Sequence, residues 1–322
     1  MRKVVLMCSH NGERFIKEQI ASITNQSATV DLLFVYDFAS SDGTRVIVRE
    51  MASIYTRTKI ILREFTHAPG AALSFFRALE EILPELNEDD CVFLADQDDV
   101  WLPNKVEIIS QEFARARRQL GVPTLTFHDV AIVNHHLTII KNSFYVRSPF
   151  KIPRDLDPER LLLANPIVGH SVAVSTDLIS LVCALDQKKK YLMHDWACVL
   201  VASRFGQIVF HNCVLSNYRQ HDANVLGAHG RHGLKGIVAR LKRHGKRVSV
   251  QAHEFIGEMI KAQSAMNPAG IREFSIDLRL KKLHSRGGIP WQYALAKSAI
   301  KRGPTPKRKL LAAFIFMCGN VR

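Results

Sequence analysis

Three carboxylates follow a run of apolar residues in the stretch CVFLADQDDVWLPNK, residues 91–105. Asp96 and Asp98 are two residues apart, so in extended backbone both side chains point to the same side. Two convergent carboxylates favour a hard divalent cation such as Mg²⁺ or Mn²⁺, which leaves room for phosphate oxygens and water. A metal there would hold a diphosphate and neutralise its charge as it leaves.

The same stretch also allows a structural interpretation. Aspartates favour turns, and WLPNK has the form of a helix start with Pro103 near the first turn. A bare D-x-D pair favours this second interpretation. The apolar run before the acids and the Trp-Leu-Pro after them favour the metal site.

The elements that must position these acids are predicted from hydrophobic periodicity. Apolar runs rich in Val, Ile, Leu and Phe alternate with stretches whose apolar residues recur at helical spacing, which predicts a mostly parallel sheet covered by helices. Ligands of such sheets bind outside the carboxyl ends of the strands, where Asp96 and Asp98 stand. The predicted strands are residues 3–9, 31–37, 58–64 and 91–97, and the helices between them are residues 15–23, 43–55 and 70–83.

The pattern after residue 120 is less regular. We expect a strand at residues 123–134, a helix at residues 194–206 closed by a glycine cap at Gly206, and paired strands at residues 207–221. We place a domain boundary near residue 225. Residues 1–225 would form the α/β domain, and residues 226–322 a basic, amphipathic helical extension.

The charge of the chain is concentrated in that extension. The net charge is +14, but residues 226–322 contain 20 Lys and Arg against 4 Asp and Glu, whereas residues 1–225 contain 24 against 26. This asymmetry indicates an anionic partner. We rank an anionic membrane surface first, with Trp291, Tyr293 and Phe314 in the interface, packing on the body or dimerisation second, and nucleic acid a distant third.

Cysteine spacing and hydropathy indicate the cellular compartment. The six cysteines show no CxxC spacing, which is typical of reduced thiols in a cytosolic protein. We find no secretory signal and no apolar stretch long enough to span a bilayer. The expected location is therefore cytoplasmic, peripheral at the inner face of the cell membrane.

Five motifs, in their order and spacing, resemble a family-2 glycosyltransferase and, more narrowly, its bacterial rhamnosyltransferase-like branch. They are CSHNGERFIKEQIASITNQS, SSDGT, ADQDDVWLPNK, HDW and YRQHDAN, and they cover roughly residues 1–225. The resemblance implies a GT-A fold, a nucleotide-diphospho-sugar donor, Mn²⁺ or Mg²⁺, and inversion at the anomeric carbon.

The resemblance also implies roles for single residues on the donor side. Ser9, His10 and Asp37 would lie by the nucleotide, and Asp96 would face the ribose and the metal. The second acid of the family's pair, which reads the base edge, is Phe38 here, and Ala39 replaces a usual Gly or Asn. Because Phe cannot accept a hydrogen bond, either another group reads the base or selectivity is weakened. Asp98 would be the direct metal ligand, with His221 as an additional metal or phosphate ligand. Asp99 would orient its neighbours, and Asp129 would lie near the donor sugar, or in a plain turn or on the surface.

On the acceptor side the resemblance implies three further residues. Asp195 of HDW would be the general base that takes the proton of the acceptor hydroxyl, and it would also be placed to cap the helix that follows. Gly169 would lie where the acceptor approaches, or in a tight turn. Trp196 would line the acceptor side or belong to the core.

We therefore expect an inverting glycosyltransferase that extends a bacterial surface polysaccharide or a lipid-linked saccharide. The branch suggests dTDP-rhamnose as donor, and Phe38 leaves UDP-sugars and others open. Two alternatives stand beside this hypothesis. One is a nucleotidyltransferase, although CSHNGERF lacks the Gly-rich, basic phosphate loop expected after the first strand. The other is a catalytically silent nucleotide-sugar-binding scaffold.

Overall fold

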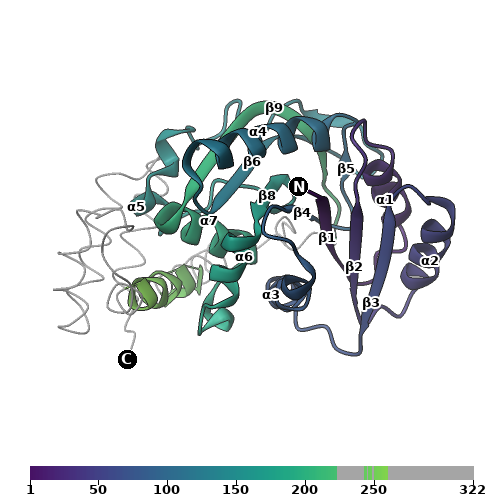
Figure 1. The fold of residues 1–322 in the computed structure, drawn as a ribbon, viewed down its shortest axis with the longest axis horizontal. Helices are drawn as coiled ribbons and strands as arrows, with labels where there is room; N and C mark the ends of the chain where they lie inside the picture. Colours follow the sequence, from purple (N-terminus) through teal and green to yellow (C-terminus); the bar gives the residue numbers. More distant parts are fainter. Residues whose placement is uncertain (223–242, 245, 249, 260–322) are drawn as a thin grey trace, which may run out of the picture.

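The computed structural model describes residues 1–222, 243–244, 246–248 and 250–259 (Figure 1). The first half alternates strands and helices, as the periodicity predicts. The second half contains longer antiparallel and parallel pairings. The principal elements are β1 (Lys3–Ser9), α1 (Ile16–Thr24), β2 (Leu32–Phe38), α2 (Thr44–Ile54), β3 (Lys59–Phe65), α3 (Ala71–Ile82), β4 (Cys91–Ala95), β5 (Val100–Trp101), α4 (Lys105–Leu120), β6 (Thr124–Val133), β7 (Ile139–Lys141), α5 (Pro158–Leu161), β8 (Val172–Ser175), α6 (Thr176–Cys183), α7 (His194–Phe205) and β9 (Gln207–Arg219).

The described strands form one sheet in the order β3-β2-β1-β4-β8-β6-β9-β5, with β7 paired to β6. Strands β3, β2, β1 and β4 run parallel, β8 is antiparallel to both β4 and β6, and β6 and β9 are parallel to each other. The carboxyl ends of β1, β2 and β4 therefore lie at one edge of the sheet. The predicted α/β class with a mixed, mostly parallel sheet is confirmed.

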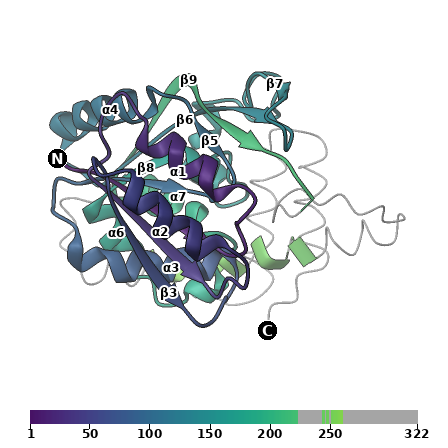
Figure 2. The ribbon, with the colours of Figure 1, turned by 90° about the vertical axis from the view of Figure 1, so that its right-hand side faces the viewer.

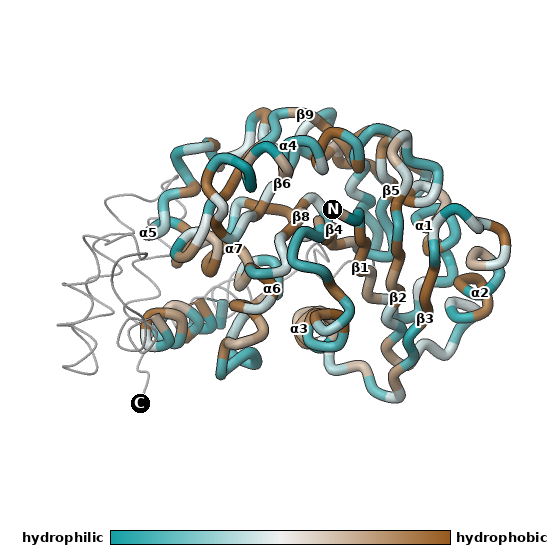
Figure 3. The backbone as a smooth tube through the Cα atoms, viewed as in Figure 1, coloured by the Kyte–Doolittle hydropathy of each residue, from teal (hydrophilic) through white to brown (hydrophobic). Residues whose placement is uncertain are grey.

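Helices cover both faces of the sheet, and the strands divide their side chains between them. Val4 and Leu6 pack in the cluster with α3, α6 and α7, whereas Val5 and Met7 pack in the cluster with α1, α2 and α4. This alternation follows from the two-residue period of a strand. Because both faces are buried, the central strands are continuously apolar, and β2 is largely brown in Figure 3.

The end of α7 differs from the prediction. Gly206 has φ −150° and ψ −140°, so it is not the left-handed cap that the sequence suggested. A Cβ at Gly206 would lie 1.8 Å from the carbonyl oxygen of Pro123, and the next residue, Gln207, donates its N–H to that same oxygen at 2.9 Å. Glycine is required here because two backbone segments approach closely.

The prediction of paired strands at residues 207–221 is wrong. Residues 207–219 form the single long strand β9, which pairs with β6 along its length and with β5 near its end. Its register against β6 shifts around Asp129, where a bulge interrupts the ladder. That irregularity breaks the alternation of apolar residues, and the sequence pattern then imitates two strands.

Part of the basic extension packs on the body. The helical residues of 243–259 bury Val248, Ala252, Phe255 and Ile256 in the cluster that contains α6 and α7. Gln251 Oε1 accepts a hydrogen bond from the backbone N–H of Leu192 at 2.7 Å. The predicted interface residues Trp291, Tyr293 and Phe314 lie outside the described residues. Across the part of the chain that the structure describes, no helix is long and apolar enough to cross a membrane.

Candidate active site

The acidic turn lies between β4 and β5, and its backbone is held from both sides. Gln19 of α1 donates its Nε2–H to the carbonyl of Asp96 at 2.9 Å, and Arg219 of β9 donates its Nε–H to the carbonyl of Asp98 at 2.7 Å. The side chain of Asp96 is 42% exposed, that of Asp98 17%, and that of Asp99 is fully buried. The turn therefore presents Asp96 and Asp98 outward and directs Asp99 into the protein.

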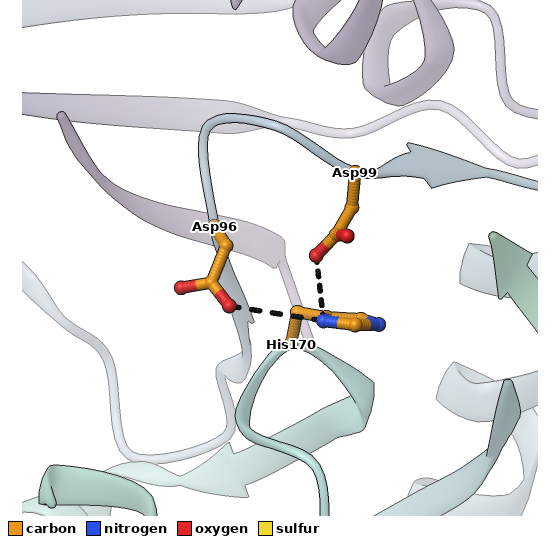
Figure 4. A group of neighbouring side chains, drawn as sticks. All are labelled: Asp96, Asp99 and His170. Carbon is orange, nitrogen blue, oxygen red and sulfur yellow. Dashed lines mark ion pairs between the residues drawn. The ribbon is translucent and has the colours of Figure 1, made fainter. Parts of the chain in front are cut away.

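Asp99 pairs with a histidine that the sequence did not single out (Figure 4). His170 Nδ1 lies 2.6 Å from an Oδ2 of Asp99 and 3.7 Å from Oδ2 of Asp96. Burial by itself would lower the pKa of His170, but Asp99 and Asp96 outweigh it and raise the pKa to about 9. His170 is therefore an imidazolium at neutral pH, and it joins the acidic turn to the loop that carries Gly169.

The two predicted metal ligands lie together at the same turn. His221 Nε2 is 2.8 Å from Oδ2 of Asp98, and the His221 ring stands 4.7 Å from the ring of Phe15. Burial, followed by the charges of Asp99 and Asp96, raises the pKa of Asp98 to about 8. Burial and the nearby Arg14 and Arg219 lower the pKa of His221. The pair thus combines a carboxyl group whose pKa is raised with an imidazole whose pKa is lowered.

These donors fit a hard divalent cation. Three carboxylates crowd within four residues, and a cation would relieve the repulsion that holds the pKa of Asp98 up. Carboxylate oxygens with one imidazole nitrogen are ligands that Mn²⁺ and Mg²⁺ accept. The predicted ligands Asp98 and His221 are one set. The other is Asp96, Asp99 and His170, whose ligand atoms all lie within 4.8 Å of one another, and His170 would have to lose a proton to serve as a ligand.

Lys105 is a second buried ionisable residue that the sequence analysis missed. It is fully buried at the start of α4, and it donates its Nζ–H to the carbonyl of His170 at 2.8 Å. Its Nζ atom lies 3.5 Å from the ring centre of Trp101. Burial lowers its pKa well below the usual value, against the opposing pull of Asp99 and Asp96. A lysine at a helix start is normally solvated, so nothing in the local pattern indicates this position.

Arg219, which the sequence analysis also missed, connects several segments of the site through hydrogen bonds. Its side chain is 3% exposed, and besides Asp98 it bonds the carboxylate of Glu18 and the carbonyl of His135, the latter at 2.7 Å. Its backbone N–H donates to Oδ1 of Asp99 at 2.9 Å. The position is the Arg of YRQH, so the motif that drew attention to His221 contained the signal.

Asp195 lies in the first turn of α7, next to Gly169. The carboxylate accepts the backbone N–H of Trp196 at 2.6 Å, and a Cβ at Gly169 would lie 3.2 Å from Oδ2 of Asp195. The side chain is almost fully buried, and that burial raises its pKa to about 7. The structure thus brings together two residues predicted for the acceptor side, and a side chain at position 169 would press against Oδ2 of Asp195.

The neighbours of Asp195 in HDW belong to the core. The indole N–H of Trp196 donates to the carbonyl of Leu161 at 2.7 Å, and the residue is 6% exposed. This is the core alternative of the prediction. His194 stacks on Phe75 of α3 with ring centres 3.7 Å apart, and burial lowers its pKa to about 4, so it is neutral. Both neighbours fix the start of α7 and with it the position of Asp195.

On the predicted nucleotide side, Asp37 is fully buried and its oxygens are occupied. They accept hydrogen bonds from the hydroxyl of Ser9 at 3.0 Å and the backbone N–H of Ser40 at 3.1 Å, from the Ser40 hydroxyl, and from Nε of Arg45 at 2.5 Å. Four donors fill the acceptor positions of a carboxylate. In this arrangement Asp37 holds the turn after β2 and has no lone pair to offer to a base.

Phe38 faces the core. It is 2% exposed and stacks on Phe65 of β3 with ring centres 4.7 Å apart and an angle of 9° between the planes. Ala39 follows in the left-handed region, with φ 57°, and donates its N–H to the carbonyl of Phe65. The left-handed residue explains why Gly or Asn is usual at this position.

His10 is exposed at the end of β1 and is tied to the acidic turn. Its backbone N–H donates to Oε1 of Gln97 at 3.0 Å, and its carbonyl accepts from Nε2 of Gln97 at 3.1 Å. Its ring nitrogen Nδ1 lies 2.7 Å from the carbonyl of Phe38. This places an exposed imidazole between the ends of β1, β2 and β4.

Asp129 is buried at the bulge of β6 and organises a loop. Its oxygens accept from the backbone N–H groups of Val130 and Phe144, at 2.8 and 2.9 Å, and from the Ser143 hydroxyl. These contacts correspond to a structural role for Asp129, the turn alternative of the prediction.

Comparison with known proteins agrees with this geometry. Residues 4–162 match the family described as glycosyl transferase family 2. The dTDP-rhamnosyl transferase RfbG of Shigella flexneri is 32% identical over 101 residues, which are 31% of this chain and 34% of that protein. The match therefore spans about a third of that relative's length.

Two solved structures show the same fold. The S. aureus TarS fragment 1–349, in complex with UDP-GlcNAc, has a TM-score of 0.50 at 14% identity, covering 96% of this chain and 83% of that one. The mannosyltransferase PcManGT of Pyrobaculum calidifontis, in complex with GDP-Man and Mn²⁺, has a TM-score of 0.50 at 18% identity, covering 98% and 84%. At these identities the likeness shows the fold alone. The part of the chain that matches glycosyl transferase family 2, residues 4–162, thus lies within a GT-A fold.

Proposed function

We propose that this protein is an inverting, metal-dependent glycosyltransferase that moves a sugar from a nucleotide-diphospho-sugar to a saccharide or lipid-linked saccharide. The observation that carries the proposal is the position of Asp195. A carboxylate with a pKa near 7 lies against a glycine, and the Gly169 loop continues into His170, which contacts the acidic turn. A general base close to a diphosphate site is what inverting transfer requires.

In the proposed reaction Asp195 takes the proton of the acceptor hydroxyl as the oxygen attacks the anomeric carbon. The bond from that carbon to the diphosphate breaks, and the diphosphate leaves with the electron pair. A divalent cation held by Asp98 and His221 would neutralise the leaving diphosphate. The imidazolium of His170 adds positive charge behind Asp96 and Asp99, and Lys105 holds the carbonyl of His170 in place. Trp196 and His194 hold the start of α7 in place.

The donor is proposed from the relative. RfbG of Shigella flexneri is a dTDP-rhamnosyl transferase, so dTDP-rhamnose is the first donor to test. The burial of Phe38 and the occupied oxygens of Asp37 mean that the base would be recognised by other groups, with exposed His10 as a stacking partner. UDP- and GDP-sugars are therefore tested beside it.

For acceptor and location we propose synthesis of a bacterial surface polysaccharide at the inner face of the cell membrane. The support is the excess of basic residues in 226–322, which suits an anionic leaflet. Part of this segment packs on the body, and the proposal assigns the membrane contact to the basic residues in the rest of it. We propose no nucleic-acid partner.

The test compares Asp195→Asn with a matched control. Asp177→Asn removes another carboxylate from the first turn of a helix, since Asp177 of α6 accepts the N–H of Leu178 at 2.8 Å and also pairs with Arg117 at 2.6 Å. Release of nucleoside diphosphate is followed with dTDP-, UDP- and GDP-sugars and lipid-linked saccharides as acceptors, and donor binding is measured in parallel.

We expect Asp195→Asn to lower transfer by about 100-fold or more without weakening donor binding, and Asp177→Asn to leave both unchanged. Full activity in Asp195→Asn would show that another group is the base. Donor binding with no transfer by the wild type to any acceptor would favour the silent scaffold. Formation of a new nucleotide–sugar bond with release of pyrophosphate would favour the nucleotidyltransferase.

A further inference from the structure

An apolar hairpin projects from the sheet at β7. Ile139 and Ile140 are 60% and 56% exposed, and Val146 on the following loop is 67% exposed. Strand β7 pairs only with β6 among the described strands, and Figure 2 shows it at the end of the sheet beside β9. Neighbouring residues of a strand point to opposite faces, so exposure of both isoleucines means that neither face of β7 is covered.

The clustering of these side chains is unusual within the described part of the chain. The other large apolar side chains exposed there are Val46 and Ile54 on helix α2, Leu120 at the end of α4, and Met1 at the N-terminus. Isolated exposed apolar residues are normal on a protein surface, whereas several on one protruding element indicate an interaction site.

The hairpin is also basic. Residues 134–154 contain Lys141, Arg147, Lys151 and Arg154, two histidines, and no Asp or Glu. Lys141, Arg147 and Lys151 are exposed, and no carboxylate of the described residues forms an ion pair with them. Arg154 is paired with Asp155 at 3.2 Å. Three exposed cations therefore flank three exposed apolar side chains.

The protein holds this hairpin in place through its active site. Arg219 donates to the carbonyl of His135 at one end, and Asp129 accepts from the backbone of Phe144 at the other. Asn134 closes the turn by accepting N–H groups of His136 and Thr138, both at 2.9 Å. The backbone that carries the exposed apolar side chains is thus held in place by polar contacts.

We propose that the hairpin of residues 134–151 docks on an anionic lipid surface, with Ile139, Ile140 and Val146 inserted at the interface and Lys141, Arg147 and Lys151 at the headgroups. Apolar residues bordered by cations are the pattern of interfacial binding. A second copy of this chain would bring like charges together, which disfavours self-association. The proposal deepens the membrane association proposed above by naming a contact in the catalytic body, and it does not depend on the basic extension.

The experiment uses the full chain and two matched triple variants. Ile139→Ser/Ile140→Ser/Val146→Ser removes the proposed contact, and Val46→Ser/Ile54→Ser/Leu120→Ser removes three equally exposed apolar side chains elsewhere. Partition is measured on phosphatidylcholine vesicles with and without phosphatidylglycerol. Both variants keep the net charge, so binding by the extension alone affects them equally.

We expect the hairpin variant to bind phosphatidylglycerol vesicles about tenfold more weakly than the wild type, and the control variant to bind equally. Lys141→Gln/Arg147→Gln is expected to weaken binding only where phosphatidylglycerol is present. In Ile140→Trp, vesicles are expected to shift the fluorescence of the added tryptophan to the blue, and in Ile54→Trp they are not.

Equal partition of wild type and hairpin variant, or no partition at all, would overturn the proposal. A change of oligomeric state in the hairpin variant without a change in partition would assign the hairpin to self-association. Transfer to a soluble saccharide is expected to be unaffected by the hairpin variant. Loss of vesicle binding and loss of the proposed glycosyltransferase activity are therefore separate results.

Discussion

Asp195 combines two demands that oppose each other. It lies at the start of α7, where a carboxylate is favoured by the helix N-terminus, yet it is buried, and burial raises its pKa to about 7. The ionised form that a general base needs is therefore costly to the fold. Asp98 shows the same conflict, since burial and its neighbours raise its pKa to about 8. Such shifted carboxylates are typical of functional sites.

The cost predicts a pH-dependent stability for Asp195→Asn. A carboxyl whose pKa is higher in the folded than in the unfolded protein stabilises the fold below its unfolded pKa, and loses this contribution as the pH rises through about 7. Between about pH 5 and about pH 8 the wild type should lose about 2–3 kcal/mol relative to the variant. Urea unfolding at both pH values, with Asp177→Asn as control, measures the difference. A pH-independent difference would contradict the raised pKa.

Phe38 gives a second prediction at this scale. Because Phe38 is buried against Phe65, restoring the family's acid with Phe38→Asp would bury a charge without a partner and remove an aromatic ring from the core. We expect a loss of at least about 4 kcal/mol in the free energy of unfolding and no gain in nucleotide affinity. Phe38→Leu should cost about 1 kcal/mol. A stable Phe38→Asp that binds a nucleotide more tightly would show that residue 38 can face the donor.

The secondary structure of the first half of the chain could be predicted from local sequence patterns. The strands near β1 to β4 and the helices between them follow from runs of Val, Ile and Leu and from helical spacing, and the acids fall at strand ends as expected. Contacts between segments far apart in the sequence could not be predicted from these local patterns. Lys105 bonds the carbonyl of His170 across 65 positions of the sequence, and His170 meets Asp99 across 71.

The role of Gly206 likewise depends on a contact with a distant segment, and a substitution can test it. The sequence suggests a helix cap, whereas in the structure Gly206, directly after α7, lies against the backbone carbonyl of Pro123. We expect Gly206→Ala to destabilise the protein by about 3 kcal/mol, since the new methyl group would meet a backbone oxygen. Gly121→Ala is the comparison. Gly121 has φ 59° with open space around its Cβ position, so only the backbone conformation should cost, about 1 kcal/mol. Equal effects in thermal unfolding would argue against the close approach.

At the scale of the whole molecule, the charge asymmetry predicts a distinct extension, but its described part shares the core of the catalytic domain. Phe255 is 5% exposed, and Glu258 accepts a hydrogen bond from the hydroxyl of Tyr191 at 3.2 Å. Composition cannot show where a helix packs. The described helical residues after the predicted boundary near residue 225 therefore pack in the same core as residues before it.

Shared packing predicts that the domain and this helical segment unfold together. Phe255→Ala should lower the free energy of unfolding by about 3 kcal/mol and preserve a single cooperative transition. Fluorescence and far-ultraviolet circular dichroism in urea should report the same midpoint. Two separate transitions, with only the minor one shifted by the substitution, would show that the segment folds independently of the body.

The central claim, a metal-dependent donor site at the acidic turn, is tested most directly by calorimetric binding of dTDP, UDP and GDP to the full chain. Each titration is run with and without Mn²⁺, on the wild type and on Asp98→Asn. We expect one nucleotide to bind in the presence of Mn²⁺ and Asp98→Asn to weaken this binding by about tenfold or more. Metal-independent binding, or binding that is equal in Asp98→Asn, would contradict the assignment of Asp98, and no binding of any nucleotide would contradict the donor site itself.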